Sequence, residues 1–343
     1  MLHNTRREFF ADVGRGMLIA SLGPALATDL GLGSAHADDD SDDVLSFGAF
    51  EPLAALMQET APDRLLPILV DRLRSGTDLR DLVAAAVLAN ARQFGGEHYR
   101  GFHAFMALAP AYRMANELPE PLKPVPVLKV LYRNTDFMQS AGGRPRETLH
   151  AIGPAALAGQ PPDQIGHLLD ANRAGDIDQS EQVFAAIARG GDEHALQSLV
   201  LRVRDRADVH TTVLLWRAWE SLEFVGRQHA HTLLRQSVRH CITEDAGLPC
   251  AHHVPKLLDD YRLVGRELGT KTANAAWIDQ TVDTLLASSP ERAMEVVAGS
   301  LAEGFLPEQV GEAVALAANQ LVLRQVPNWE GAFGLRVHGD SPG

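Results

Sequence analysis

The sequence predicts an all-α protein, an array of antiparallel helical hairpins that forms either a helical bundle or a short α-solenoid. Apolar residues recur at steps of three and four along most of the chain, which is the spacing that places them on one face of a helix. Gly and Pro interrupt these stretches at intervals that suit helices of about 10–18 residues. Few stretches show the apolar–polar alternation that is typical of a half-buried strand.

Four stretches carry the helical spacing most clearly. Their apolar stripes are Leu65, Leu66, Ile68, Leu69 and Leu73; Leu82, Ala85, Ala86 and Ala89; Leu214, Ala218, Leu222 and Val225; and Val310, Ala313, Val314 and Ala317. We expect residues 44–343 to form a single all-helical domain. If that domain has two halves, they are expected to meet near 155–165.

The first 37 residues predict export. Arg6 and Arg7 precede two phenylalanines, a short apolar stretch covers 16–23, and Ala35-His36-Ala37 follows as an A-x-A cleavage site. This order resembles the twin-arginine (Tat) signal peptide of bacterial exported proteins. The apolar stretch is too short and too Gly-interrupted for a permanent membrane span. Residues 38–43, which are Asp-Asp-Asp-Ser-Asp-Asp, read as a solvated acidic linker.

The Tat resemblance has three implications. It makes the Tat translocon a partner during export, with Arg6 and Arg7 as the recognised pair and Ala35 and Ala37 at the cleavage site. It places the mature chain in the periplasm or another extracytoplasmic, oxidising compartment. Because Tat substrates usually cross the membrane already folded, often with a cofactor inserted beforehand, it also raises the expectation of a metal or cofactor.

A weak internal repeat joins two distant segments. Leu73-x-x-Gly76, followed by an Ala-rich apolar helix pattern, aligns with Leu301-x-x-Gly304 and a similar pattern. This arrangement resembles the helical repeat of the carboxymuconolactone decarboxylase and alkylhydroperoxidase D-like families. The redox members of those families carry a C-x-x-C pair, which this sequence lacks, so their thiol peroxidase chemistry is not implied. Any array of helical hairpins would also produce this spacing.

The charge balance excludes one class of partner. The 343 residues include 31 Lys and Arg against 44 Asp and Glu, which gives a formal net charge of −13. A general nucleic-acid binder needs a basic surface, so no nucleic-acid partner is expected.

Histidine is the most conspicuous catalytic residue type, with 14 in the chain. No two histidines are spaced i,i+4 and no H-E-x-x-H motif occurs, so a metal site would have to be assembled from different helices. His210 opens a predicted helix that runs to Val225. A turn at Gly226 would then bring His229 back beside Glu220 or Glu223.

His103 completes the predicted site because it lies in an aromatic-rich helix, where a buried imidazole needs a polar partner. We therefore expect His103, His210 and His229 to line one polar cleft as catalytic residues. The predicted metal ligands are His210, His229, Glu220 and Glu223, a set that suits iron, manganese or zinc.

Cys241 and Cys250 are separated by nine positions across a Gly-Leu-Pro turn. In an oxidising compartment the simplest expectation is a disulfide that closes this loop. Two free thiols, or a metal site formed with His240 and His252 or His253, are the alternatives.

The sequence favours an exported, metal- or cofactor-assisted enzyme with a histidine-lined cleft and an unidentified substrate, and the route of export favours redox chemistry. The alternative is a non-catalytic helical-repeat interaction protein of the periplasm. A metal that is lost when the histidines are replaced favours the enzyme. A metal-free protein with an exposed apolar groove favours the interaction protein.

Overall fold

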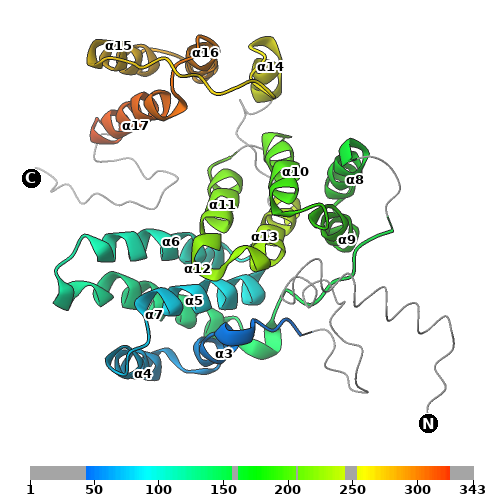
Figure 1. Ribbon diagram of the computed structural model, residues 1–343, viewed down its shortest axis with the longest axis vertical. Helices are drawn as coiled ribbons and strands as arrows, with labels where there is room; N and C mark the ends of the chain where they lie inside the picture. Colours follow the sequence, from blue (N-terminus) through cyan, green and yellow to red (C-terminus); the bar gives the residue numbers. More distant parts are fainter. Residues whose placement is uncertain (1–43, 157–160, 206–207, 244–252, 325–343) are drawn as a thin grey trace, which may run out of the picture. The chain divides into compact units, whose positions relative to one another are not determined.

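The computed structural model describes residues 44–156, 161–205, 208–243 and 253–324. Within these ranges the chain is built from helices joined by turns (Figure 1), and its sole β-type pairing there is an isolated bridge between Lys271 and Phe305. The predicted all-α class is therefore confirmed. None of the helices in these ranges is long and apolar enough to cross a membrane.

The contacts divide the chain into two compact units, residues 1–247 and residues 248–343. The division lies in a segment well after 155–165, where the sequence placed the meeting of two halves. The described helices of the first unit are α3 (Glu51–Glu59), α4 (Pro62–Arg74), α5 (Leu79–Phe94), α6 (Tyr99–Asn116), α7 (Pro124–Ser140), α8 (Pro161–Ala174), α9 (Ile177–Ala188), α10 (Asp192–Asp205), α11 (Val209–Glu220), α12 (Leu222–Val225) and α13 (Ala230–Thr243).

Helix α5 is the centre of the first unit. It begins where the Asp78 carboxylate accepts a hydrogen bond from the backbone N–H of Arg80, and it ends at Gly95. Every residue from Leu82 to Phe94 is buried, because α3, α6, α7, α12 and α13 all pack against α5. The sequence predicted an amphipathic helix here. The small side chains on its other faces instead allow neighbouring helices to approach from all sides.

The segment between His210 and His229 is less regular than predicted. Asp208 caps α11 by accepting hydrogen bonds from the backbone N–H groups of His210 and Thr211, and the Thr211 hydroxyl accepts one in return from the Asp208 N–H. The helix ends at Glu220, and the short α12 follows after Ser221. The chain then turns at Gly226, as predicted, and the 3-10 turn Arg227–His229 leads into α13.

The second unit contains α14 (His253–Asp260), α15 (Ala275–Leu286), α16 (Pro290–Ala302) and α17 (Pro307–Leu323). Helix α15 packs against α17, and α14 packs against α16. The two copies of the internal repeat take the same form. Helix α4 turns at Gly76 into α5, and α16 turns at Gly304 into α17.

Candidate functional site

The structure brings His103 and His210 together. His103 lies in the first turn and a half of α6, and His210 is the second residue of α11, which packs against α6. Their ring centroids are 5.1 Å apart and the ring planes are inclined by 71°. Both residues are half-buried, so the pair is accessible from solvent.

In each ring, Nδ1 faces an oxygen at the start of the helix that carries the histidine. The Nδ1 atom of His103 lies 2.7 Å from the carbonyl oxygen of Tyr99. Because a carbonyl can only accept, Nδ1 of His103 is the donor in this contact, which leaves Nε2 on the other side of the ring. The Nδ1 atom of His210 lies 3.7 Å from the Asp208 carboxylate. In the described part of the chain, no hydrogen bond is made at Nε2 of either ring.

Aromatic rings surround this pair. The ring centroid of Tyr99 lies 4.4 Å from that of His103 and 6.0 Å from that of His210, and 60% of Tyr99 is exposed. The buried Phe102 contacts both histidines, at 4.7 and 5.4 Å, and on another side it meets His240 at 4.8 Å. Fully buried His240 contacts the Gly96 carbonyl through Nδ1, at 2.9 Å, so it belongs to the packing beneath the pair.

His229 does not join His103 and His210. It is 6% exposed, and its ring meets the edges of Phe47 and Phe50 at centroid distances of 5.9 and 6.4 Å. The Gly226 turn does fold the chain back, but α12 and the following 3-10 turn direct His229 to the apolar region next to the start of α3. The predicted three-histidine cleft is therefore reduced to a pair.

Glu220 and Glu223 bind arginines instead of a metal. The Glu220 carboxylate is 4% exposed and pairs with Arg113, at 2.6 Å, and with Arg217. Glu223 lies 3.5 Å from the same Arg113 guanidinium. Among the described residues, no three or more His, Cys, Asp or Glu side chains gather in a group that could hold a metal ion. The ligand set His210, His229, Glu220 and Glu223 therefore does not assemble, because local helix geometry separates the histidines and arginines occupy the carboxylates.

Cys241 is buried in α13, and its backbone carbonyl accepts a hydrogen bond from the Arg202 guanidinium at 2.7 Å. Cys250 and His252 lie outside the described residues, so the predicted disulfide and its metal alternative remain predictions.

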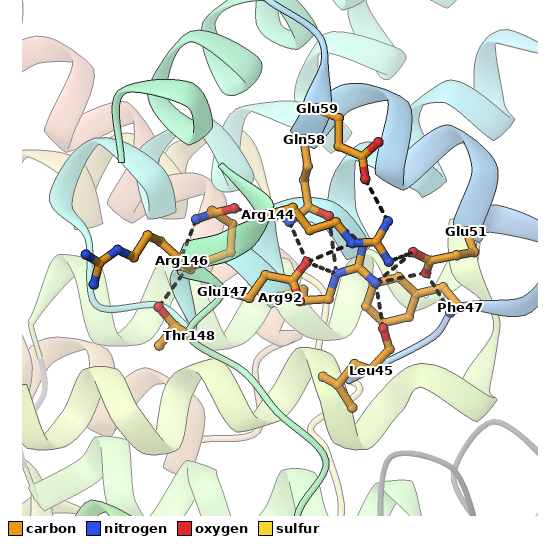
Figure 2. Close-up of polar contacts among 11 residues, drawn as sticks. Leu45, Phe47, Glu51, Gln58, Glu59, Arg92, Arg144, Arg146, Glu147 and Thr148 are labelled. Atoms are coloured by element: carbon orange, nitrogen blue, oxygen red, sulfur yellow. Dashed lines mark hydrogen bonds and ion pairs between the residues drawn. The ribbon is translucent and has the colours of Figure 1, made fainter. Parts of the chain in front are cut away.

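A second polar cluster, which the sequence analysis missed, surrounds Arg92 of α5. Figure 2 shows its guanidinium enclosed by Glu51, Gln58 and Glu147. Nη1 of Arg92 lies 2.8 Å from Glu51 and donates to the Leu45 carbonyl, and Nε lies 3.0 Å from Glu147. The guanidinium also lies over the Phe47 ring, 4.7 Å from its centroid.

The Arg92 cluster joins α5 to neighbouring segments of the first unit. The Arg92 carbonyl accepts hydrogen bonds from the N–H groups of Thr148 and Leu149, and Arg144 pairs with Glu51 and Glu59. Arg92 itself is fully buried and every side of its guanidinium is in contact with protein. The Arg92 guanidinium therefore serves to join these segments, because none of it is exposed. The signal in the sequence was the polar group Asn90, Arg92 and Gln93 at the end of an Ala-rich apolar run.

Glu147 and His98, which lie near these clusters, have shifted pKa values. Burial raises the pKa of the Glu147 carboxyl, against the opposing effect of the nearby Arg92 and Arg144 guanidinium groups. Burial, aided by the positive charge of Arg100, lowers the pKa of His98. His98 caps α6 by accepting a hydrogen bond at Nδ1 from the Gly101 N–H, a role that needs the neutral ring.

A pocket of about 420 Å³ lies elsewhere in the first unit, between the α9–α10 turn and the start of α13. Its charged residues include Asp192 and Arg227, which pair with each other at 2.6 Å. Arg227 also covers the Trp219 ring, 4.4 Å from its centroid. The His103–His210 pair is therefore the better candidate for chemistry, because the two histidines do not form an ion pair or hydrogen bond with each other.

No family model matches this chain, and neither a curated protein nor a solved structure shows significant similarity to it. The resemblance of its internal repeat to the carboxymuconolactone decarboxylase and alkylhydroperoxidase D-like families thus stays a prediction. The fold and the site define an all-helical protein with a half-buried histidine pair, and any function has to be argued from those residues.

Proposed function

We propose that this chain is an exported, metal-dependent enzyme in which His103 and His210 bind a divalent transition-metal ion. The observation that carries the proposal is the arrangement of the two rings. Their centroids are 5.1 Å apart, and Nδ1 of each ring faces an oxygen.

This arrangement suits metal binding in two respects. Imidazole ligands usually donate their second N–H to a carbonyl or carboxylate, which fixes the tautomer and makes the other nitrogen a better ligand. Tyr99 supplies such an oxygen to His103, whereas the Asp208 carboxylate lies 3.7 Å from Nδ1 of His210, beyond hydrogen-bond distance, and acts on that ring through its charge. In addition, two imidazoles that share one ion at about 2.0–2.1 Å have ring centroids about 5 Å apart.

Two protein ligands leave several coordination positions open. Structural zinc sites close all four positions with protein side chains, whereas catalytic sites have three protein ligands and keep one position for water or substrate. The pair supplies two of these ligands, and both rings are half-buried beside the exposed Tyr99. Zinc there would polarise a carbonyl or lower the pKa of bound water, and iron or manganese would support redox chemistry.

The predicted route of export supports the same proposal. Arg6, Arg7 and the A-x-A sequence at Ala35–Ala37 are ordered as in a Tat signal, and the Tat route is used by proteins that acquire a metal or cofactor before export.

The proposal is tested by metal titration of the mature chain, purified through its native export route and stripped with a chelator. Calorimetry with Zn²⁺, and the visible spectrum of added Co²⁺, should show one saturable site. His103→Ala or His210→Ala should abolish it. His167→Ala is the matched control, because His167 is an exposed histidine on α8, and it should bind as the native protein does.

Asp208→Asn sharpens the test. Asn preserves the cap of α11, because it caps helices as well as Asp does, but it removes the negative charge beside His210. We expect metal affinity to fall by roughly 10-fold with unchanged circular dichroism. If the native protein shows no saturable site, or if both histidine variants bind normally, the pair serves packing only. The helical interaction protein is then the better assignment.

A further inference from the structure

The second unit has a small hydrophobic core. Among its described residues, 253–324, the buried apolar cluster consists of Val282, Ala313 and Ala317, with Trp277, Ile278, Leu285 and Leu286 partly buried against it. Helix α15 and helix α17 enclose this cluster, whereas α14 and α16 contribute little to it. A helical unit of this size needs more buried apolar surface to be stable.

A groove in the same unit provides apolar surface that is not yet covered. It has a volume of about 500 Å³, and all its lining residues are Ala, Val, Leu or Met, contributed by all four helices. Leu257 of α14, Val297 of α16 and Val314 of α17 are among them. Val314 is 40% exposed, although a residue at this position of the apolar stripe is expected to be buried.

The exposed apolar surface continues to the end of α17. Leu321, which lines the groove, is 54% exposed, and the next two residues, Val322 and Leu323, are 58% and 85% exposed. Three consecutive exposed apolar residues at a helix end are unusual in a water-soluble surface. The chain continues directly from this point as residues 325–343.

We propose that residues 325–343 dock in this groove and complete the core of the second unit. The segment contains Trp329, and Phe333, Leu335 and Val337 alternate with Gly334 and Arg336. In an extended chain this alternation places the three apolar side chains on one side. Gly331, Gly334 and Gly339 with Pro327 and Pro342 favour an extended segment over a helix.

The segment is long enough to reach. Residues 325–337 span up to roughly 40 Å when extended, at about 3.3 Å per residue. Helix α17 has 17 residues and is about 26 Å long, at 1.5 Å per residue. The segment can therefore run back beside α17 over the whole groove. This proposal is independent of the histidine pair in the first unit.

The test compares variants of the mature chain that differ only within the docking segment. Phe333→Ser combined with Leu335→Ser removes two apolar anchors without touching α14–α17. Arg336→Ser is the matched control, because it lies between them and points to the other side of an extended segment. We expect the double variant to raise the fluorescence of bound anilinonaphthalene sulfonate about twofold or more, and the control to leave it unchanged.

Hydrogen exchange gives the second readout. Protection of α14, α16 and the last turns of α17 should fall in the double variant, and also in a chain that ends at Arg324. A synthetic peptide of residues 325–343 should restore both protection and low dye fluorescence in the shortened chain. If the shortened chain equals the full one in both measurements, the proposal is overturned and the groove is open to another protein or an apolar ligand. A dimer of the full chain that dissociates in Val314→Asp, with no effect of the segment variants, would overturn it in favour of a second copy.

Discussion

Arg92 and Glu51 form an ion pair of 2.8 Å in which the arginine is fully buried and the glutamate is 20% exposed. The two residues are 41 positions apart, and the pair joins the central helix α5 to the start of α3. Glu147 approaches the same guanidinium from a third segment of the chain. The packing of three distant segments against one another therefore depends on one buried charge.

Replacing Arg92 tests this dependence. Arg92→Met removes the cation but keeps an apolar side chain, and it leaves the buried Glu147 with only the more distant Arg144 guanidinium, at 3.7 Å, as a charged partner. We expect the free energy of unfolding to fall by about 3–5 kcal/mol, as when one partner of a buried ion pair is removed. Urea denaturation followed by circular dichroism measures it. Arg74→Met is the control, because its pair with Asp71 is about three-quarters exposed on both sides, and a change above about 0.5 kcal/mol there would argue against our distinction.

The Glu147 carboxyl should make stability depend on pH. Because burial raises its pKa in the folded state above the ordinary value of 4.5, the folded protein holds this proton more tightly than the unfolded chain. Its stabilising contribution is full below pH 4.5 and is lost as the pH rises through the raised pKa. Chemical denaturation at several pH values should show this loss in the native protein and a flatter profile in Glu147→Gln. An equal slope in both proteins would refute the assignment.

Gly96 is a position where the backbone conformation and the packing both require glycine. Its φ is +83°, and a Cβ there would lie 2.5 Å from the Gln236 carbonyl oxygen of α13. Gly96→Ala should therefore destabilise the protein by more than about 1 kcal/mol. Gly166→Ala on α8, where a Cβ meets nothing within 4 Å, should instead stabilise it by roughly 0.5–1 kcal/mol. Thermal unfolding of the two variants distinguishes the cases, and shifts of the same sign would contradict the geometry.

Export should depend on Arg6 and Arg7. Both lie outside the described residues, so this prediction comes from the sequence alone. Changing the pair to Lys-Lys should leave uncleaved precursor in the cytoplasm, because the Tat pathway recognises the arginines. Immunoblots of cell fractions measure this, with Arg15→Lys as the control for charge-conserving change in the same segment. Normal processing of the Lys-Lys protein would remove the Tat assignment.

Cys241 and Cys250 should form a disulfide in exported protein. Bridging requires Cα atoms about 4.4–6.8 Å apart, a separation that a loop of this length allows. The unreduced protein should be lighter than the reduced protein by the mass of two hydrogens. Two thiols that both react with an alkylating agent before reduction would exclude the bridge.

The sequence by itself determined the helices of this protein. Spacing at three and four residues and breakers such as Gly76 and Gly304 are local properties, and they mark where helices form and end without knowledge of their neighbours. The turn at Gly226 was predicted for the same reason. The interruption of the helix at Ser221 was not, because an apolar stripe runs through it unbroken.

Only the tertiary structure decided which polar residues meet. His103, chosen for its aromatic-rich helix, and His210, chosen as the opening of a helix, do lie side by side. His229 does not join them, because the orientation of a short helix and turn cannot be read from spacing. Glu220 and Glu223 were predicted to bind a metal. In the structure both carboxylates pair with Arg113, a partner more than 100 positions away. Arg92 escaped prediction for the same physical reason. A buried charge is stable only where several distant segments converge on it, and the packing of the helices alone determines that convergence.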